Sequence, residues 1–462
     1  MSIDFPKNWK QVVLEDALDA LIDYRGKTPK KVDKGIPLIT AKVVKSGRIL
    51  PMDEFIADED YESWMVRGIP QISDIVVTTE APLGEVAQIK NANVALAQRI
   101  VTLRGKVDFL ENDFLLFLMQ SDFVQNQLEA RATGSTVKGI KQSELRKIIL
   151  PIPPIVEQKC IGKILSDLDD KIHLNNQINQ TLESIAQAIF KSWFIDFDPV
   201  RAKITAKREG KDTELAAMCV ISGKSQEELK QMSKDDFAEL QASAALFPDE
   251  LVETELGEVP KGWDKYSLSK MITLIGGGTP KRSEPNYWNG DIFWFSVKDV
   301  PNEGEVFVIT TQEKISELGL NKSSTKLLPV GTTIITARGT VGKIALVGYE
   351  MAMNQSCYGV QGINGVRQFM TYYLIKNAVE VLKKNTHGAV FDTITQSTFD
   401  TVTSIKPSIE MMDLFESKVE KIMGHIKNNL YENNSLIALR DTLLPKLLSG
   451  ELDVSGVQDE VA

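Results

Sequence analysis

Two long stretches of the chain repeat apolar residues at alternating spacings of four and three. The first runs from Ile161 to Ile189, and the second runs from Phe415 to Leu443, 254 residues later. A 4-3 spacing places side chains along one seam of a helix, which is typical of a coiled coil. The first seam contains Ile161, Leu165, Leu168, Ile172, Asn175, Asn179, Leu182, Ala186 and Ile189, and the second contains Phe415, Val419, Ile422, Ile426, Asn429, Asn433, Leu436, Arg440 and Leu443.

Both seams contain a pair of asparagines at the same place, and the second seam is interrupted at Arg440. Buried asparagine weakens a seam but fixes its register, because a slip leaves the amide unpaired. The matching pairs favour two helices that pack against each other. The alternative is two amphipathic helices that pack on separate cores. Each helix follows its own domain, so we expect the pairing to be antiparallel.

The rest of the chain is also duplicated. Pro6-Lys7-Asn8-Trp9 recurs as Pro260-Lys261-Gly262-Trp263, again 254 residues later. The Gly-Lys-Thr-Pro-Lys segment that begins at Gly26 recurs as Gly-Gly-Thr-Pro-Lys from Gly277. The offset rises to 258 in the middle of the repeat, as expected when loops differ in length around a shared scaffold.

Each copy has the same internal order of patterns. Short apolar runs, such as 75–79 and 332–336, predict strands. A helical stretch, a Gly/Thr/Ser-rich loop and a proline-marked entry into the long helix follow. The predicted fold class is therefore α+β, with two similar domains of mixed strands and helices joined by a long antiparallel two-helix coiled coil.

Composition excludes several classes of protein. The 462 residues are 43% hydrophobic and 25% charged, which is typical of globular proteins with more than one domain. The N-terminus lacks the pattern of a signal peptide, and no apolar run is long enough for a membrane span. Three cysteines and three histidines are scattered, which argues against disulfides and zinc sites. We expect a cytoplasmic, metal-free protein.

The net charge of −10 argues against binding to nucleic acid until its distribution is considered. The segment 209–258 has thirteen acids and four lysines, so it contains nearly all of the acidic excess. We expect its polar stretch 208–250 to face solvent and to be mobile, or only loosely helical. In contrast, the segment 25–48 has eight Lys/Arg and one acid, and the segment 131–147 has five bases and one acid. These basic stretches are either solvated faces or contacts for phosphates.

A run at the end of the first long helix, Phe190-Lys191-Ser192-Trp193-Phe194-Ile195-Asp196-Phe197-Asp198-Pro199-Val200-Arg201-Ala202-Lys203, adds the most specific motif. With the repeated Pro-Lys-x-Trp starts, Thr-Pro-Lys segments and proline-entry helices, it makes the whole chain resemble the specificity subunit of type I restriction–modification systems. The resemblance implies target-recognition domains at 1–150 and 259–405, spacer helices at 151–200 and 406–450, an acidic connector at 201–258 and an acidic tail at 451–462.

The resemblance also implies what the chain does. Each target-recognition domain reads one half of a split sequence in double-stranded DNA, and the paired helices set the spacing. Two methylation subunits and a restriction/translocase subunit are the implied partners, with no role for a membrane. S-adenosylmethionine, ATP and magnesium are expected in those partners only, so this chain is expected to have no cofactor and no catalytic residue.

The residues themselves also lack catalytic motifs. The Asn/Asp-Pro-Pro-aromatic motif is absent, since Asp198-Pro199-Val200 does not match it. The glycine-rich stretch 276–281 contains a proline and lacks the Gly-Lys-Ser/Thr spacing of a P-loop. Gly342-Lys343-Ile344 fails the same test, because Ile344 stands where a hydroxyl is needed.

DNA recognition needs cations for phosphates and polar groups for base edges. The candidates for phosphate contacts are Lys27, Lys30, Lys31, Lys138, Lys141, Lys281, Arg282 and Lys343. The candidates in polar turns are Thr79, Glu80, Gln98, Gly134, Ser135, Ala337, Arg338, Gln355 and Gly388, and the predicted DNA-binding set also includes Thr28 and Thr279 of the Thr-Pro-Lys segments. Each of these residues is otherwise explained as a turn residue that serves only the fold, and each glutamine as a buried link between strands. Glu80 aligns with Arg338, and this mismatch predicts different half-sites, because glutamate suits cytosine and arginine suits guanine.

Trp193 and Phe194 align with Leu447 and Leu448 at the ends of the two long helices. They are either core residues or an apolar face that binds a methylation subunit. An alternative function for the whole chain is a structural adaptor, with two peptide-binding modules on a coiled-coil strut.

Overall fold

A computed structural model describes residues 5–24, 28–45, 47–254, 257–385 and 393–454. The chain forms two compact units. The first unit comprises Met1–Ile172 and Asn434–Ala462, and the second comprises His173–Asn433. Both divisions lie inside the long helices, whereas the sequence placed domain boundaries at the helix starts. Each unit therefore includes its own portion of both helices.

The first unit is built around a four-stranded antiparallel sheet with the order β2-β10-β7-β8. These strands are β2 (Leu18–Asp23), β10 (Ile100–Gly105), β7 (Ile75–Thr79) and β8 (Leu83–Gln88). All five residues of β7 are buried, and β-branched residues suit such a covered strand. The helix α3 (Asn112–Gln120) buries six consecutive residues, Phe114–Met119, in the same core as β7 and β10.

Smaller elements complete the first unit. The sheet β6-β3-β9 combines β6 (Phe55–Ile56), β3 (Ile36–Ile39) and β9 (Ala95–Leu96), and β1 (Lys10–Val13) pairs with β11 (Ile149–Ile152). A hairpin joins β4 (Val44–Lys45) and β5 (Arg48–Ile49). The remaining helices are α1 (Leu14–Ala17), η1 (Asp58–Asp60), α2 (Tyr61–Trp64), α4 (Asp122–Arg131) and α5 (Gln142–Leu145).

The second unit repeats this topology. Its main sheet has the order β15-β22-β19-β20-β17, with β15 (Ile272–Gly276), β22 (Cys357–Gly362), β19 (Thr333–Thr336), β20 (Ile344–Val347) and β17 (Phe307–Val308). The sheet β18-β16-β21 combines β18 (Glu313–Ile315), β16 (Trp288–Phe295) and β21 (Met351–Met353). Its short helices outside the connector are η2 (Leu268–Lys270), η3 (Pro285–Tyr287), η4 (Val297–Asp299), α11 (Glu317–Asn321) and α13 (Gln396–Asp400), and α12 (Gln368–Asn385) is longer.

The duplication extends to strand register. In the first unit Lys10 pairs with Ile152, and in the second Asp264 of β14 (Asp264–Ser267) pairs with Lys406 of β23 (Thr403–Lys406). Both members of the second pair stand 254 residues after those of the first. The predicted tandem repeat and α+β class are confirmed.

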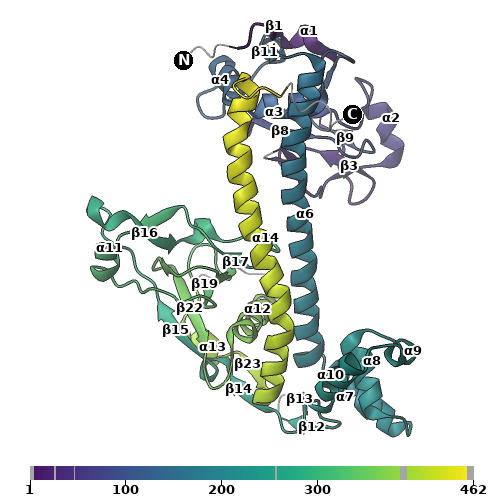
Figure 1. Ribbon diagram of the computed structural model, residues 1–462, viewed down its shortest axis with the longest axis vertical. Coiled ribbons are helices and arrows are strands. Elements are labelled where there is room, and N and C mark those ends of the chain that lie inside the picture. The colour runs from purple at the N-terminus through teal and green to yellow at the C-terminus, as the bar shows by residue number, and fades with distance from the viewer. Residues whose placement is uncertain (1–4, 25–27, 46, 255–256, 386–392, 455–462) are drawn as a thin grey trace. The chain divides into compact units, whose positions relative to one another are not determined.

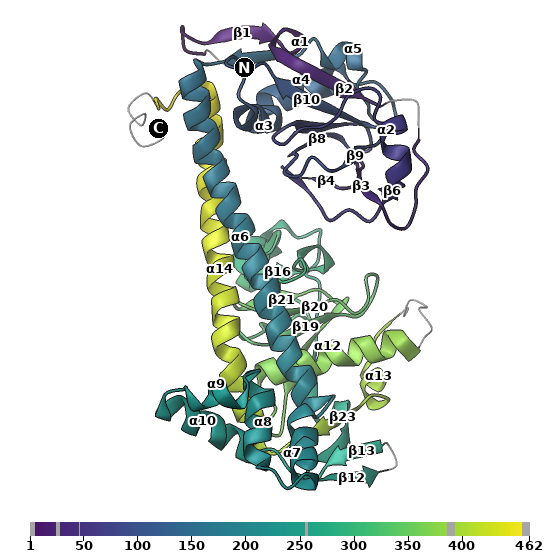
Figure 2. The ribbon, with the colours of Figure 1, turned by 90° about the vertical axis from the view of Figure 1, so that its right-hand side faces the viewer.

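The two long helices are α6 (Ile155–Phe194) and α14 (Ile409–Ser449), and they lie side by side in Figures 1 and 2. In the second unit, Asn175 Nδ2 donates to Asn433 Oδ1 at 2.9 Å, and Asn429 Nδ2 donates to Asn179 Oδ1 at 2.9 Å. Increasing numbers on α6 thus meet decreasing numbers on α14, which confirms antiparallel pairing.

Arg440, which interrupts the predicted seam, has a structural explanation in the first unit. Its Nη1 donates to Asp169 Oδ1 of α6 at 2.8 Å, and its Nε donates to Asp441 Oδ1 at 3.0 Å. The guanidinium thus replaces an apolar contact with a hydrogen-bonded ion pair between the same two helices, and the antiparallel direction is unchanged.

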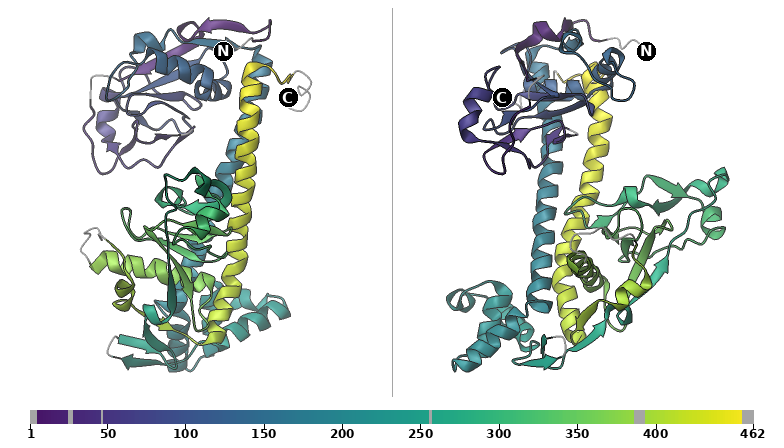
Figure 3. Two further views of the ribbon diagram at one scale, coloured as in Figure 1. Left: turned by 90° about the vertical axis from the view of Figure 1, so that its left-hand side faces the viewer. Right: turned by 180° about the vertical axis from the view of Figure 1, so that it is seen from behind.

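The acidic connector was expected to be mobile or only loosely helical, and this prediction was wrong. It folds into α7 (Asp198–Arg208), α8 (Thr213–Ser222), α9 (Gln226–Lys230) and α10 (Lys234–Ala245), which Figure 3 shows gathered together. A hairpin of β12 (Leu251–Thr254) and β13 (Gly257–Pro260) follows. The connector has its own small core of Ala217, Met218, Leu229, Leu240 and Ala244. Its helices also have side-chain caps, from Asp212, Ser225 and Ser233, so acidic composition did not prevent local order.

The proposed docking residues at the helix ends also need correction. Trp193 and Phe194 are each 3% exposed and pack with Phe415 in the core of the second unit. Leu447 and Leu448 are buried in the core of the first unit. They hold helices to their own units, so they do not provide an exposed apolar face for a partner.

Among the described helices, none has the length and apolar character needed to cross a membrane.

Candidate nucleic-acid interface

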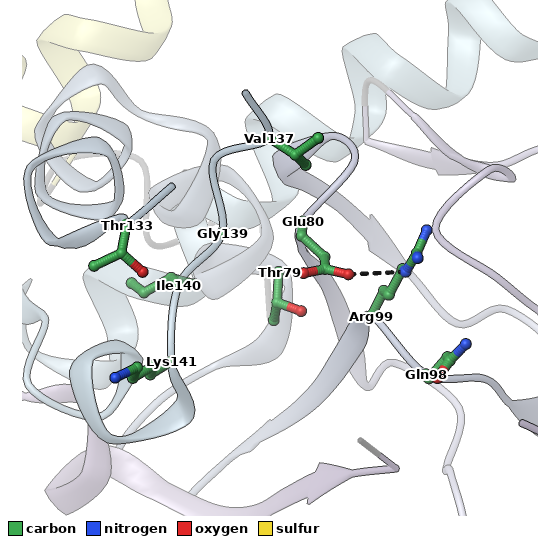
Figure 4. A pocket seen from close by; sticks show the side chains of 9 residues that line it. All are labelled: Thr79, Glu80, Gln98, Arg99, Thr133, Val137, Gly139, Ile140 and Lys141. Atoms are coloured by element: carbon green, nitrogen blue, oxygen red, sulfur yellow. Dashed lines mark ion pairs between the residues drawn. The ribbon is translucent and has the colours of Figure 1, made fainter. Parts of the chain in front are cut away.

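Three loops from distant parts of the first unit meet at one place. They are the β7–β8 turn, the β9–β10 loop and the loop after α4. Ile140 N donates to Thr79 O at 2.9 Å, and Thr79 N donates to Arg99 O at 2.8 Å. The loops surround a depression of about 360 Å³ lined by Thr79, Glu80, Gln98, Arg99, Thr133, Val137, Gly139, Ile140 and Lys141 (Figure 4).

The second unit joins its loops in the same way. Ile394 N donates to Ala337 O at 3.0 Å, and Ala337 N donates to Ser356 O at 2.7 Å. The bridge between Glu80 and Gly139 likewise has a counterpart between Arg338 and Thr393. The molecule therefore contains two copies of one loop framework, and their side chains differ.

A threonine at the end of the central strand shapes each turn. Thr78 Oγ1 accepts from Glu85 N at 2.9 Å, and Thr336 Oγ1 accepts from Lys343 N at 2.9 Å. Such side-chain bonds to the backbone are typical of turns. The turns are thus held by backbone contacts, which leaves the outward side chains free to differ between units.

Gly134 has a structural reason to be glycine. Its φ is +113°, and an added Cβ would lie 2.1 Å from Val137 O. Only glycine tolerates both conditions. The neighbouring Ser135 is exposed, so this loop can present a hydroxyl while the glycine makes the turn.

Two residues predicted to contact bases, Thr79 and Ala337, are buried and do not fit that role. Each is 2% exposed, and each uses its backbone N–H and C=O to join the loops. These two residues position the turns, and their side chains are not presented to a ligand. The adjacent side chains are accessible, because Glu80 and Gln98 are half-buried in the depression and Arg338 is exposed.

The glutamines Gln98 and Gln355 do not have the same surroundings. Gln98 lines the depression, whereas Gln355 is exposed and accepts a hydrogen bond from Thr279 Oγ1. Thr28, the counterpart of Thr279, is exposed. Gly388 and Lys27 lie outside the described residues.

The remaining cations of the predicted set are all exposed, but they differ in their contacts. Lys31 pairs with Glu54 at 2.8 Å, Lys138 pairs with Glu129, and Lys281 lies 3.4 Å from Glu284. Lys30, Lys141 and Lys343 are exposed, and only Lys141 of these lines the depression. Exposed ion pairs are weak, so none of these contacts prevents a lysine from meeting a phosphate.

Arg282 is held more firmly. Its Nη2 donates to Glu313 Oε2 at 3.0 Å, and its guanidinium carbon lies 3.7 Å from the centre of the Trp288 ring. The hydrogen bond from Arg282 lowers the pKa of the Glu313 carboxyl, and the same bond raises the pKa of Arg282. Lys31 and Glu54 form the equivalent pair in the first unit, so this contact is part of the shared scaffold.

Arg99 lines the depression and pairs with Glu80 at 2.8 Å, although it was not among the residues predicted to bind DNA. A signal was available, because Arg99 directly follows Gln98 in the repeat and aligns with Ser356. A charged residue that differs between two copies of one loop marks a position that the scaffold does not fix. Within the described residues, no group of three or more His, Cys, Asp or Glu side chains could hold a metal ion.

Comparisons with known proteins agree with this arrangement. The family model of the type I restriction modification DNA specificity domain matches residues 6–184 and 260–411. The chain is 34% identical over 376 residues to the type I restriction enzyme HindI specificity subunit of Haemophilus influenzae, covering 78% of this chain and 82% of that protein. It is 24% identical to the MjaIX specificity subunit of Methanocaldococcus jannaschii, covering 97% and 94%.

A solved structure has a similar fold. The crystal structure of a type I restriction–modification S subunit from M. genitalium aligns with a TM-score of 0.52 at 14% identity. The alignment covers 97% of this chain and 98% of that one.

Proposed function

Since the chain belongs to the type I restriction–modification DNA specificity family, we propose that each of its units reads one half of a split DNA target. Specificity subunits recognise DNA sequence within a type I complex and are not themselves catalytic. This family membership decides against the adaptor alternative.

The observation that supports a split target is the duplicated loop framework with unlike side chains. Both units join the same three loops by the same backbone hydrogen bonds. Glu80 and Arg99 in one framework are replaced by Arg338 and Ser356 in the other. Because polar groups of different kinds select different bases, two such frameworks would read different half-sites.

The paired helices would set the distance between the half-sites. Each seam extends over roughly 40 Å at about 1.5 Å per residue, comparable to one turn of DNA at about 34–36 Å. Asparagine pairs in the seam would fix that distance by fixing the register.

The chain would act with partners that perform the chemistry. Two methylation subunits would bind S-adenosylmethionine and modify adenines, and a restriction/translocase subunit would use ATP and magnesium. This chain would contribute no cofactor site of its own. Exposed lysines of the loop regions, such as Lys30, Lys141 and Lys343, would hold the DNA backbone.

A domain exchange tests the proposal. Residues 264–403 are replaced by the same region of another family member, and the chimaera is produced with its methylation partners in cells. Methylated adenines are then mapped across the genome. One half of the methylated sequence should change, while the other half and the spacing are retained.

The reciprocal exchange of residues 10–150 is the matched control, and it should change only the other half. A chimaera that alters both halves would contradict independent reading. Purified complexes should bind their target in a salt-sensitive manner, since each phosphate contact releases a counterion.

A further inference from the structure

The depression of the first unit is lined by a guanidinium that is paired with a carboxylate. Arg99 Nε lies 2.8 Å from Glu80 Oε1, and the two side chains are 53% and 44% exposed. Figure 4 shows this pair at the mouth of the β7–β8 turn. A carboxylate that accepts from Nε leaves the terminal Nη groups of arginine available, and the planar guanidinium keeps them in a defined direction.

Glu80 is itself confined. Gly139 approaches so closely that an added Cβ would lie 3.2 Å from Glu80 Cβ and 3.4 Å from Glu80 Oε2. A backbone bridge joins the same two residues. With one side against Gly139 and one oxygen on Arg99, the Glu80 carboxylate is placed to orient Arg99.

The backbone conformation of Arg99 is uncommon for a residue other than glycine. Its φ is +73°, in the left-handed region that favours glycine and asparagine. Thr79 N nevertheless donates to Arg99 O at 2.8 Å and holds the residue there. Non-glycine residues in this conformation are often found at functional sites, where the surrounding structure maintains them.

The second unit presents an arginine at the same junction from a different loop. Arg338 occupies the place of Glu80, and Ser356 occupies the place of Arg99. Arg338 is exposed. Each framework therefore has one arginine where its loops meet. Aligning Glu80 with Arg338 does not reveal this similarity, because the two arginines come from different loops.

We propose that Arg99 is a specificity-determining residue that reads a guanine in one half-site, with Glu80 as its positioning residue. The terminal Nη groups donate to guanine O6 and N7, which is the arrangement that arginine makes most often with bases. Glu80 contributes by fixing the guanidinium and does not contact cytosine. The proposal rests on the proposed function of the chain as a reader of split DNA targets.

The test maps methylated adenines genome-wide for complexes containing Arg99→Ala, Arg99→Lys, Glu80→Gln or no substitution. Arg99→Ala should reduce discrimination for guanine about 10- to 100-fold at one base pair of one half-site, and leave the other half-site unchanged. Arg99→Lys keeps the charge but loses the planar fork, so it should relax the same base pair. Glu80→Gln should relax that base pair too, but less, because the amide oxygen can still accept from Nε.

Two matched controls accompany these variants. Lys90→Ala removes an exposed cation of the same unit that does not line the depression, and it should leave the methylated sequence unchanged. Arg338→Ala should relax only the other half-site. Far-UV circular dichroism and thermal unfolding verify that each variant folds.

The outcomes separate the possibilities. If Arg99→Ala lowers methylation at all targets equally and Arg99→Lys restores it, Arg99 contacts a phosphate and the proposal is overturned. If Glu80→Gln relaxes a different base pair from Arg99→Ala, Glu80 reads a base itself and its positioning role is wrong. An unchanged base preference in the Arg99 variants overturns the role of Arg99 alone. If instead the unsubstituted chain yields no split methylated sequence, the proposed function itself fails.

Discussion

The buried asparagine pair of the helix seam leads to a quantitative prediction. Asn175 and Asn433 are 1% and 6% exposed, and Asn175 Nδ2 donates both to Asn433 Oδ1 at 2.9 Å and to Glu432 Oε2 at 2.8 Å. Asn433 Nδ2 donates to Asn176 Oδ1 at 2.7 Å. Asn175 Oδ1 has no partner among the described residues. The pair is therefore desolvated and only partly satisfied.

Replacing one member should cost more than replacing both. In Asn433→Leu or Asn175→Leu, the remaining buried amide loses a partner, and a stranded polar group costs about 1–3 kcal/mol. In the double variant two leucines meet and apolar area is buried. Asn176 and Glu432 lose a donor, but the first is half-buried and the second exposed, so water can replace it and no fully buried amide is stranded. We expect the double variant to be at least as stable as the unsubstituted chain, with a coupling free energy of about 1–3 kcal/mol.

Hydrogen exchange measured by mass spectrometry on peptides of α6 and α14 reports the opening free energy of this helix pair directly. Additive effects of the two single substitutions, or a double variant less stable than both, would refute the pairing. Loss of the asparagines should also loosen the register. Adenine methylation by the double variant should then include targets whose spacing differs by about three base pairs, the length of one heptad of about 10 Å.

Three further predictions concern other parts of the molecule. The first lengthens both helices by seven residues, inserted after Ile172 in α6 and after Asn433 in α14, where the two units end. The spacing of methylated half-sites should grow by about three base pairs. Unchanged spacing at full activity would show that the helices do not set this distance. Trp193→Ala should destabilise the second unit by about 3–5 kcal/mol in urea unfolding, whereas a residue of an exposed docking face would lower only partner binding. Burial raises the pKa of the Glu416 carboxyl, so the stability contributed by this group is fully present below about pH 4.5 and is lost as the pH rises through the raised pKa. Relative to Glu416→Gln, the native chain should therefore gain stability in urea unfolding as the pH falls from the raised pKa to about 4.5. A stability difference that stays constant with pH would contradict this.

Some of this molecule could be predicted from sequence because the signals are local or periodic. The 4-3 seam defined the long helices, since an α-helix brings residues three and four apart to one face. The duplication predicted two similar domains, because similar sequences fold alike, and the structure places Lys10 and Asp264 in equivalent strands 254 residues apart. Antiparallel pairing followed from the order of domains and helices. It matches the first asparagine of one helix with the second of the other, Asn175 with Asn433.

Prediction from composition failed where short-range packing overrode it. The acidic connector was expected to be mobile or only loosely helical, yet a few apolar residues such as Met218 and Leu229 form a core beneath its charges. Likewise, Trp193 suited a docking face as well as a core in the sequence, because a hydrophobic residue at a helix end does not show what covers it. Contacts with Phe415 and Phe247, far away in the chain, decide that question.

The candidate site shows the same division between what is local and what is tertiary. Sequence alone determined that two polar turns, at Glu80 and Arg338, stand at equivalent places and differ in charge. Only the tertiary structure decided that Arg99 meets Glu80 and that Gly139 approaches Glu80, because strand order brings together loops that are separated along the chain. Periodicity specifies which face of a helix or strand is buried, but the side chains that meet at the ends of strands depend on the folding of the whole sheet.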